Sequence, residues 1–83
     1  MTVKAFVLIE TAVGKTRDVE AALKVIEGIR SVDRVTGPYD IIAVIEGENL
    51  KDIGDFFITK IYPIPGISRT VGCLNNENEG EPT

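Results

Sequence analysis

The chain has 83 residues, 13 acidic and 9 basic, and its formal net charge of -4 argues against direct nucleic-acid binding, which needs clustered Lys and Arg. Histidine is absent and Cys73 is the single cysteine, which excludes an intrachain disulfide and a multi-cysteine metal site, and we predict no cofactor. No run approaches the roughly 20 apolar residues of a membrane-spanning helix, and no secretory signal precedes the first strand, so we expect a cytoplasmic protein.

Residues 3–10 predict a first strand that is apolar on both faces in its middle, as is typical of a central strand. A helix is expected next, because apolar residues recur at spacings of three and four. Its apolar stripe is formed by Val19, Ala22, Leu23, Ile26 and Ile29. We expect Thr16 to act as the N-cap of this helix and Gly28 to end it.

Three further strands and a second helix follow. Residues 31–36 and 67–74 mix polar with apolar positions and predict edge strands, whereas residues 39–47 predict a second central strand. Asn49 is expected to cap a helix that ends before Pro63. The apolar side of this helix is formed by Leu50, Ile53, Phe57 and Ile61.

This order of elements predicts an α+β fold, namely a ferredoxin-like βαββαβ domain whose four-stranded antiparallel sheet has the strand order 4-1-3-2. The two strands that are apolar on both faces take the central places in that order. We assign the domain to residues 1–75. Residues 76–83 lose periodicity and are rich in Asn and Glu, so we expect a flexible acidic C-terminal tail there.

One face of the predicted sheet has no cover. Both helices are expected on the same face, while Phe6, Leu8, Ile42 and Val44 belong to the other. An exposed apolar surface of this kind exceeds what soluble monomers usually leave in water, so two sheets packed face to face are expected. We therefore predict at least a homodimer, with the architecture of a dimeric α/β barrel.

The segment between the second and third strands carries three candidate ligand-binding residues. Gly37 would let the backbone approach a small molecule, Tyr39 supplies a hydroxyl and a ring, and Asp40 can pair with an ammonium group. Asp40 directly precedes a buried strand, where a carboxylate needs water or a polar partner. The alternatives are a plain hairpin connection and a solvated carboxylate at the mouth of the strand.

The last strand supplies the other polar candidates. Ser68 and Thr70 offer hydroxyls on one face and Arg69 offers a guanidinium on the other, so they are candidates for binding a carboxylate across a subunit boundary. An ordinary polar edge strand explains the same residues equally well. Cys73 has no basic triad nearby, and we expect it to be buried as a small apolar side chain.

Three segments resemble the effector-binding domain of the Lrp/AsnC family of transcription regulators, also called the RAM domain. They are KAFVLIET at the start, TGPYDIIAVIE in the middle and IPGISRTVGCL at the end. The middle and last segments are the specific ones: a glycine and an Asp before an apolar strand, and Pro-Gly before a strand with hydroxyl residues. The resemblance spans nearly the whole predicted domain.

The resemblance implies dimers whose sheets face each other, assembly of dimers into rings, and amino acids bound between dimers. The residues that it places at the ligand are Gly37, Tyr39, Asp40, Ser68, Arg69 and Thr70. Full-length relatives carry an N-terminal helix-turn-helix domain, whereas this sequence begins at the first strand. We therefore expect a stand-alone module that senses amino acids, or that joins a full-length regulator and modulates transcription through it.

Two other functions are compatible with this fold. Similar protomers form small cofactor-free dimeric α/β-barrel enzymes, but the missing His and the lack of paired catalytic groups argue against this function. We predict no enzymatic activity. A structural adaptor that captures a partner without any ligand is the remaining alternative.

Overall fold

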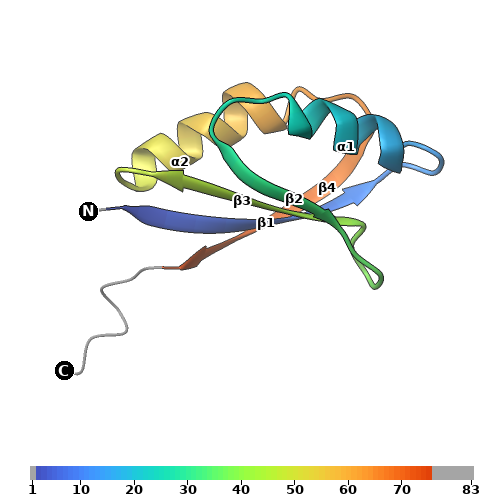
Figure 1. Cartoon of the computed structure of the whole chain (residues 1–83), viewed down its shortest axis with the longest axis horizontal. Coiled ribbons are helices and arrows are strands. Elements are labelled where there is room, and N and C mark those ends of the chain that lie inside the picture. The colour runs from blue at the N-terminus through green and yellow to red at the C-terminus, as the bar shows by residue number, and fades with distance from the viewer. Residues whose placement is uncertain (1, 76–83) are drawn as a thin grey trace.

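The computed structural model describes residues 2–75 and shows the expected βαββαβ order (Figure 1). Its elements are β1 (Val3–Thr11), α1 (Thr16–Lys24), β2 (Ile29–Arg34), β3 (Ile41–Gly47), α2 (Leu50–Phe56), η1 (Phe57–Ile61) and β4 (Ile67–Asn75). No helix within residues 2–75 has the length and apolar character to cross a membrane. The tail predicted for residues 76–83 lies outside the described range and stays a prediction.

The four strands form one antiparallel sheet in the order β2-β3-β1-β4. This is the predicted 4-1-3-2 order counted from the other edge, so the ferredoxin-like fold is confirmed. In the centre of the sheet, Val7 of β1 lies between Ala43 of β3 and Gly72 of β4. The two strands that are apolar on both faces therefore occupy the middle, where each pairs on both sides.

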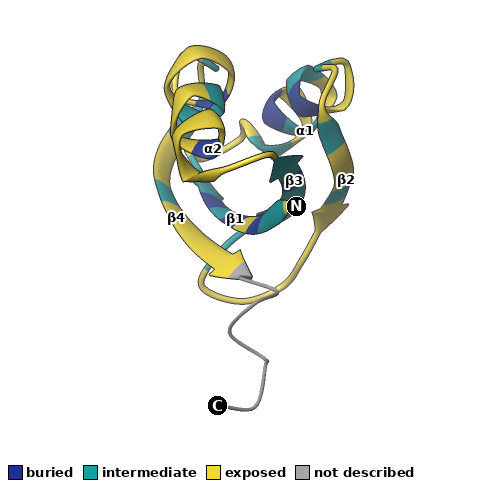
Figure 2. Cartoon of the chain, turned by 90° about the vertical axis from the view of Figure 1, so that its left-hand side faces the viewer, coloured by how far each residue is buried: buried dark blue, intermediate teal, exposed yellow. Residues whose placement is uncertain are grey.

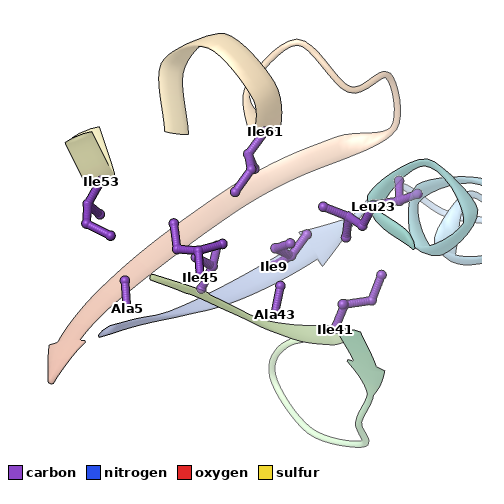
Figure 3. Close-up of a cluster of buried hydrophobic side chains, with 10 residues drawn as sticks. Ala5, Ile9, Leu23, Ile41, Ala43, Ile45, Ile53 and Ile61 are labelled. Atoms are coloured by element: carbon purple, nitrogen blue, oxygen red, sulfur yellow. The ribbon is translucent and has the colours of Figure 1, made fainter. Parts of the chain in front are cut away.

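Both helices cover the same face of the sheet, as Figures 1 and 2 show. Alternate strand residues and the inner side of the helices form a continuous buried core (Figure 3). The sheet contributes Ala5, Val7, Ile9, Ile41, Ala43 and Ile45, and the helical segments contribute Val19, Leu23, Ile53 and Ile61. All of these side chains are 5% exposed or less, so the helix-covered side needs no partner.

The opposite face of the sheet carries a second apolar layer that no other part of residues 2–75 covers. We call it the open sheet face, and it consists of Phe6, Leu8, Ile42, Val44, Val71 and Cys73. Phe6 is 37% exposed, and Cys73 lies opposite it on the edge strand β4 with its thiol exposed. The expectation that Cys73 is buried is therefore wrong for the single chain, because its side chain belongs to the uncovered layer.

Helix α1 differs from the sequence prediction at both ends. Its N-cap is Lys15, which makes no side-chain capping bond, and the hydroxyl of Thr16 instead lies 2.7 Å from that of Thr11. The predicted capping role of Thr16 is therefore wrong. The helix stops at Lys24, and Ile29, assigned to the helical stripe, is the first residue of β2. The apolar period continued past the helix because both segments bury residues against the same core.

The second helix begins as predicted, because the Asn49 side chain accepts a hydrogen bond from the Asp52 N–H at 2.9 Å. Leu50, expected on the buried side, is 59% exposed, so that assignment is wrong. The last turn, η1, is a π-helix that widens the backbone spiral. It keeps Ile61 fully buried, and the helical segment ends before Pro63 as expected.

Gly28 allows the chain to turn tightly from α1 into β2. Its φ is +105°, and a Cβ added there would lie 2.8 Å from a ring carbon of Phe56. We therefore expect Gly28→Ala to lower the free energy of unfolding by about 2–3 kcal/mol, measured by urea denaturation at a fixed protein concentration. Gly54→Ala is the control: Gly54 lies within α2 with open space around the added methyl, so a gain of about 0.5–1 kcal/mol is expected. Equal changes in the free energy of unfolding for the two substitutions would contradict the positive φ of Gly28 and its close approach to Phe56.

Candidate ligand-binding site

The candidate residues of the two sequence segments meet at one end of the sheet. At this end β1 finishes at Thr11, β3 begins at Ile41 and β4 begins at Ile67. The connection between β2 and β3, residues 35–40, projects from the same end, at the right of Figure 1. Tyr39 and Asp40 belong to this connection, as predicted for the candidate ligand-binding residues, although the strand predicted for residues 39–47 also included them.

Arg69 and Tyr39 are in direct contact. An Nη of Arg69 donates a hydrogen bond to the Tyr39 hydroxyl at 3.2 Å, and the guanidinium carbon lies 5.5 Å from the centre of the ring. The Nε of Arg69 also lies 3.6 Å from the Glu10 carboxylate. The Arg69 side chain is 62% exposed, so this ion pair contributes little stability and the guanidinium remains open to a ligand.

The Asp40 carboxylate is held by the end of β1. Its Oδ2 accepts hydrogen bonds from the Thr11 N–H at 2.8 Å and from the Thr11 hydroxyl at 3.1 Å. The backbone of Asp40 is fixed as well: its N–H donates to the Ile9 carbonyl at 2.8 Å, and its carbonyl accepts from the Val35 N–H at 2.9 Å. Asp40 as a residue is half-buried, and hydrogen bonds hold both its backbone and its carboxylate.

Ser68 lies where the pairing of β1 with β4 changes register, between Glu10 and Thr11. Its hydroxyl donates a hydrogen bond to the Glu10 carbonyl at 3.0 Å. The Ser68 proton is therefore in use within the fold. The oxygen of this hydroxyl can still accept a hydrogen bond.

The other two candidates are less closely associated. Thr70 lies opposite Ile9 and so belongs to the helix-covered face, away from the Arg69 guanidinium. Gly37 has a φ of +147° and is exposed, and an added Cβ would meet no atom within 4 Å. The structure thus joins Tyr39 to Arg69, Ser68 to Glu10 and Asp40 to Thr11, all at the same end of the sheet, and leaves Thr70 and Gly37 outside these contacts.

Comparison with known proteins assigns the family. Residues 4–74 match the family model of the Lrp/AsnC ligand binding domain, which is far more than half of the chain. The chain belongs to this family. No curated protein gives a significant match.

Solved structures agree with the assignment. The crystal structure of FFRP-DM1 superposes with a TM-score of 0.83 and 35% identity, covering 89% of this chain and 99% of that one. A hypothetical protein from Pyrococcus horikoshii gives a TM-score of 0.82 with 35% identity and 89% coverage of both chains. A transcriptional regulator from Neisseria meningitidis, solved as a complex with L-Met, shares the fold at a TM-score of 0.79 and 13% identity. That match covers 89% of this chain and 49% of the regulator.

Two cavities of this Lrp/AsnC ligand-binding domain are lined by residues other than Tyr39, Asp40 and Arg69. One of about 290 Å³ separates the first turns of α1 from the loop before β4, with Lys15, Ile64 and Pro65 among its lining residues. Another of about 450 Å³ lies at the opposite end of the sheet, beside Gly28 and Glu46. Tyr39, Asp40 and Arg69 line neither of them.

Two further residues at this end of the sheet, Glu10 and Thr11, were not among the candidates predicted from the sequence. The carboxylate of Glu10 contacts Arg69, and its carbonyl accepts the hydrogen bond of Ser68. Thr11 is the last residue of the first strand. Its contact with Asp40 becomes visible only in the structure, where β1 extends beyond the start of β3. A hydroxyl residue at a strand end is the sole signal in the sequence.

Proposed function

We propose that this domain binds a free amino acid at the Tyr39–Asp40–Arg69 cluster. The observation that carries the proposal is the presence of the carboxylate of half-buried Asp40 and the exposed guanidinium of Arg69 at the same end of one sheet. An amino acid has one ammonium and one carboxylate, and this pair of groups complements both. The L-Met complex of the Neisseria regulator, which has the same fold, supports this class of ligand.

Each group has a definite role in this proposal. The ammonium of the ligand pairs with Asp40 on the oxygen that Thr11 does not occupy, Oδ1. The carboxylate of the ligand pairs with Arg69, whose guanidinium is oriented by the Tyr39 ring and hydroxyl. Binding involves no chemical conversion. The side chain of the ligand meets the wall that a second copy of the domain supplies.

We further propose that two copies pair through the open sheet face. The exposed layer around Leu8 and Val44 is apolar and continuous over the central strands and β4, which is typical of a permanent homodimer interface. Dimers then associate at their Asp40 ends and enclose the ligand. A longer regulator with the same domain would offer the same face, so this interface also suits co-assembly with such a regulator.

Thermal unfolding in the presence of each of the twenty proteinogenic L-amino acids tests the binding proposal. An amino acid at about 100 times its dissociation constant should stabilise the protein by roughly 2.7 kcal/mol. Such a shift is readily measured by differential scanning calorimetry. If none of the twenty raises the transition temperature at 10 mM or more, amino-acid binding by this domain is excluded in that range.

Arg69→Gln should weaken binding of the selected amino acid about tenfold, because the charged partner of its carboxylate is lost. Arg17→Gln is the matched control, since Arg17 lies exposed on α1 and outside the cluster. Isothermal titration of both variants compares the dissociation constants directly. Equal losses in the two variants would indicate a general effect of charge and would remove Arg69 from the site.

A further inference from the structure

The Asp40 carboxylate has an unusual attachment: both donors to its Oδ2 come from the same residue, Thr11. A carboxylate that accepts two hydrogen bonds on one oxygen cannot rotate freely, and its second oxygen is fixed in direction. Freezing a side chain before the ligand arrives removes an entropic cost from binding. Thr11 therefore controls the orientation of the group to which the proposed function assigns the ligand ammonium.

The strand register explains why the Thr11 N–H is free for this purpose. The ladder between β1 and β3 ends at the pair of Ile9 with Ile41, so β1 extends beyond the start of β3. Thr11 lies on this extension, where no strand residue pairs with it on that side. Its N–H would be left without a backbone acceptor, and the Asp40 side chain takes the place of the missing strand.

The Thr11 hydroxyl also connects the site to helix α1. It lies 2.7 Å from the Thr16 hydroxyl and 3.1 Å from Asp40 Oδ2. A hydroxyl has one proton, and the ionised carboxylate can only accept. The Thr11 proton therefore goes to Asp40, and Thr16 donates to Thr11. This directed chain of hydrogen bonds runs from the first residue of α1 to the carboxylate.

We propose that Thr11 is a positioning residue of the amino-acid site, which holds Asp40 Oδ2 so that Oδ1 faces the ligand ammonium. This inference rests on the proposed function and adds to it a residue that does not touch the ligand. Thr16 supports the arrangement from α1. Removing the Thr11 hydroxyl leaves the Thr11 N–H as the one donor from this residue to Oδ2, so the carboxylate rotates more easily and forms hydrogen bonds with water in place of the ligand. The Thr16 hydroxyl acts on the carboxylate through Thr11.

Thr11→Val tests the inference, because valine keeps the β-branched shape and the backbone N–H but loses the hydroxyl. Isothermal titration uses L-methionine, or the amino acid that stabilises the wild type most, together with its deaminated carboxylic acid. We expect Thr11→Val to weaken amino-acid binding about tenfold and to leave binding of the deaminated acid within twofold. Thr11→Ser, which restores the hydroxyl, should regain most of the affinity. The control Thr59→Val removes a hydroxyl that bonds the Asp55 carbonyl on α2, and should have no effect.

The outcomes separate the two proposals. If the wild type binds an amino acid and Thr11→Val binds it equally well, the positioning role is wrong while the proposed function stands. A parallel loss for the amino acid and for the deaminated acid would show a general disturbance of the fold, and would also overturn the inference. If the wild type binds none of the twenty amino acids, the proposed function fails and the role of Thr11 fails with it.

Discussion

Leu8→Glu is expected to convert the assembled protein into monomers. Leu8 lies in the middle of β1, between Ile42 of β3 and Val71 of β4, at the centre of the open sheet face. In a face-to-face dimer, two symmetry-related copies of the new carboxylate would be removed from water without a partner, which costs several kcal/mol. We expect the dimer dissociation constant to rise at least about a thousandfold.

Sedimentation velocity at about 10 µM measures this change directly. The wild type should sediment as a dimer or a larger assembly, and Leu8→Glu as a single chain with an unchanged far-ultraviolet circular dichroism spectrum. Val13→Glu is the control, because Val13 is fully exposed in the turn after β1 and lies outside the open sheet face. A monomeric wild type, or a dimer that survives Leu8→Glu, would refute pairing through this face.

Asp40→Asn is expected to abolish most of the amino-acid affinity while leaving the fold intact. The amide oxygen of Asn can still accept both hydrogen bonds from Thr11, so the end of β1 keeps its partner. The NH₂ group of the side chain in this variant then faces the ligand ammonium. Both groups are hydrogen-bond donors, so the ion pair is replaced by an unfavourable contact. Loss of this charged hydrogen bond should weaken binding about 30- to 100-fold.

Asp40→Ala is a poorer test of the same site, because it also removes the acceptor for the Thr11 N–H and would lower stability by about 1–3 kcal/mol. Titration calorimetry on Asp40→Asn should therefore be accompanied by a melt without ligand. Asp55→Asn serves as the control, since it alters only an exposed ion pair with Lys51 on α2. An unchanged dissociation constant in Asp40→Asn would show that Asp40 does not bind the ligand and that its carboxylate has only a structural role.

The sequence predicted the fold because its strongest signals are local and redundant. Two strands with apolar residues on both faces require central places, and the Asn49 cap followed three residues later by Asp52 marks a helix start by simple geometry. The uncovered layer was also predictable, because alternation in a strand assigns Phe6 and Leu8 to the face opposite Val7. These features can be read from short stretches of sequence, because strand alternation and helix capping involve only neighbouring residues.

The rest depends on tertiary register, which no local pattern encodes. Ile29 continues the period of α1 although it starts β2, because a core residue on either element faces the same buried space. Thr16 has the chemistry of an N-cap, yet its hydroxyl is occupied by Thr11. The contact of Arg69 with Tyr39 joins residues 30 positions apart and follows from the strand order together with the β1–β4 register shift. The candidate residues were therefore predictable as types and segments, but their hydrogen-bond partners were not.

The rate at which the exposed Cys73 reacts with a thiol reagent should report how far the protein has associated into dimers. A maleimide dye needs open access to the sulfur, and a neighbouring copy resting on that layer would obstruct it. Labelling speed should therefore slow as protein concentration rises, and adding an effector that tightens the assembly should slow it further. The labelling rate of this one thiol therefore measures the monomer–dimer equilibrium without an added label site.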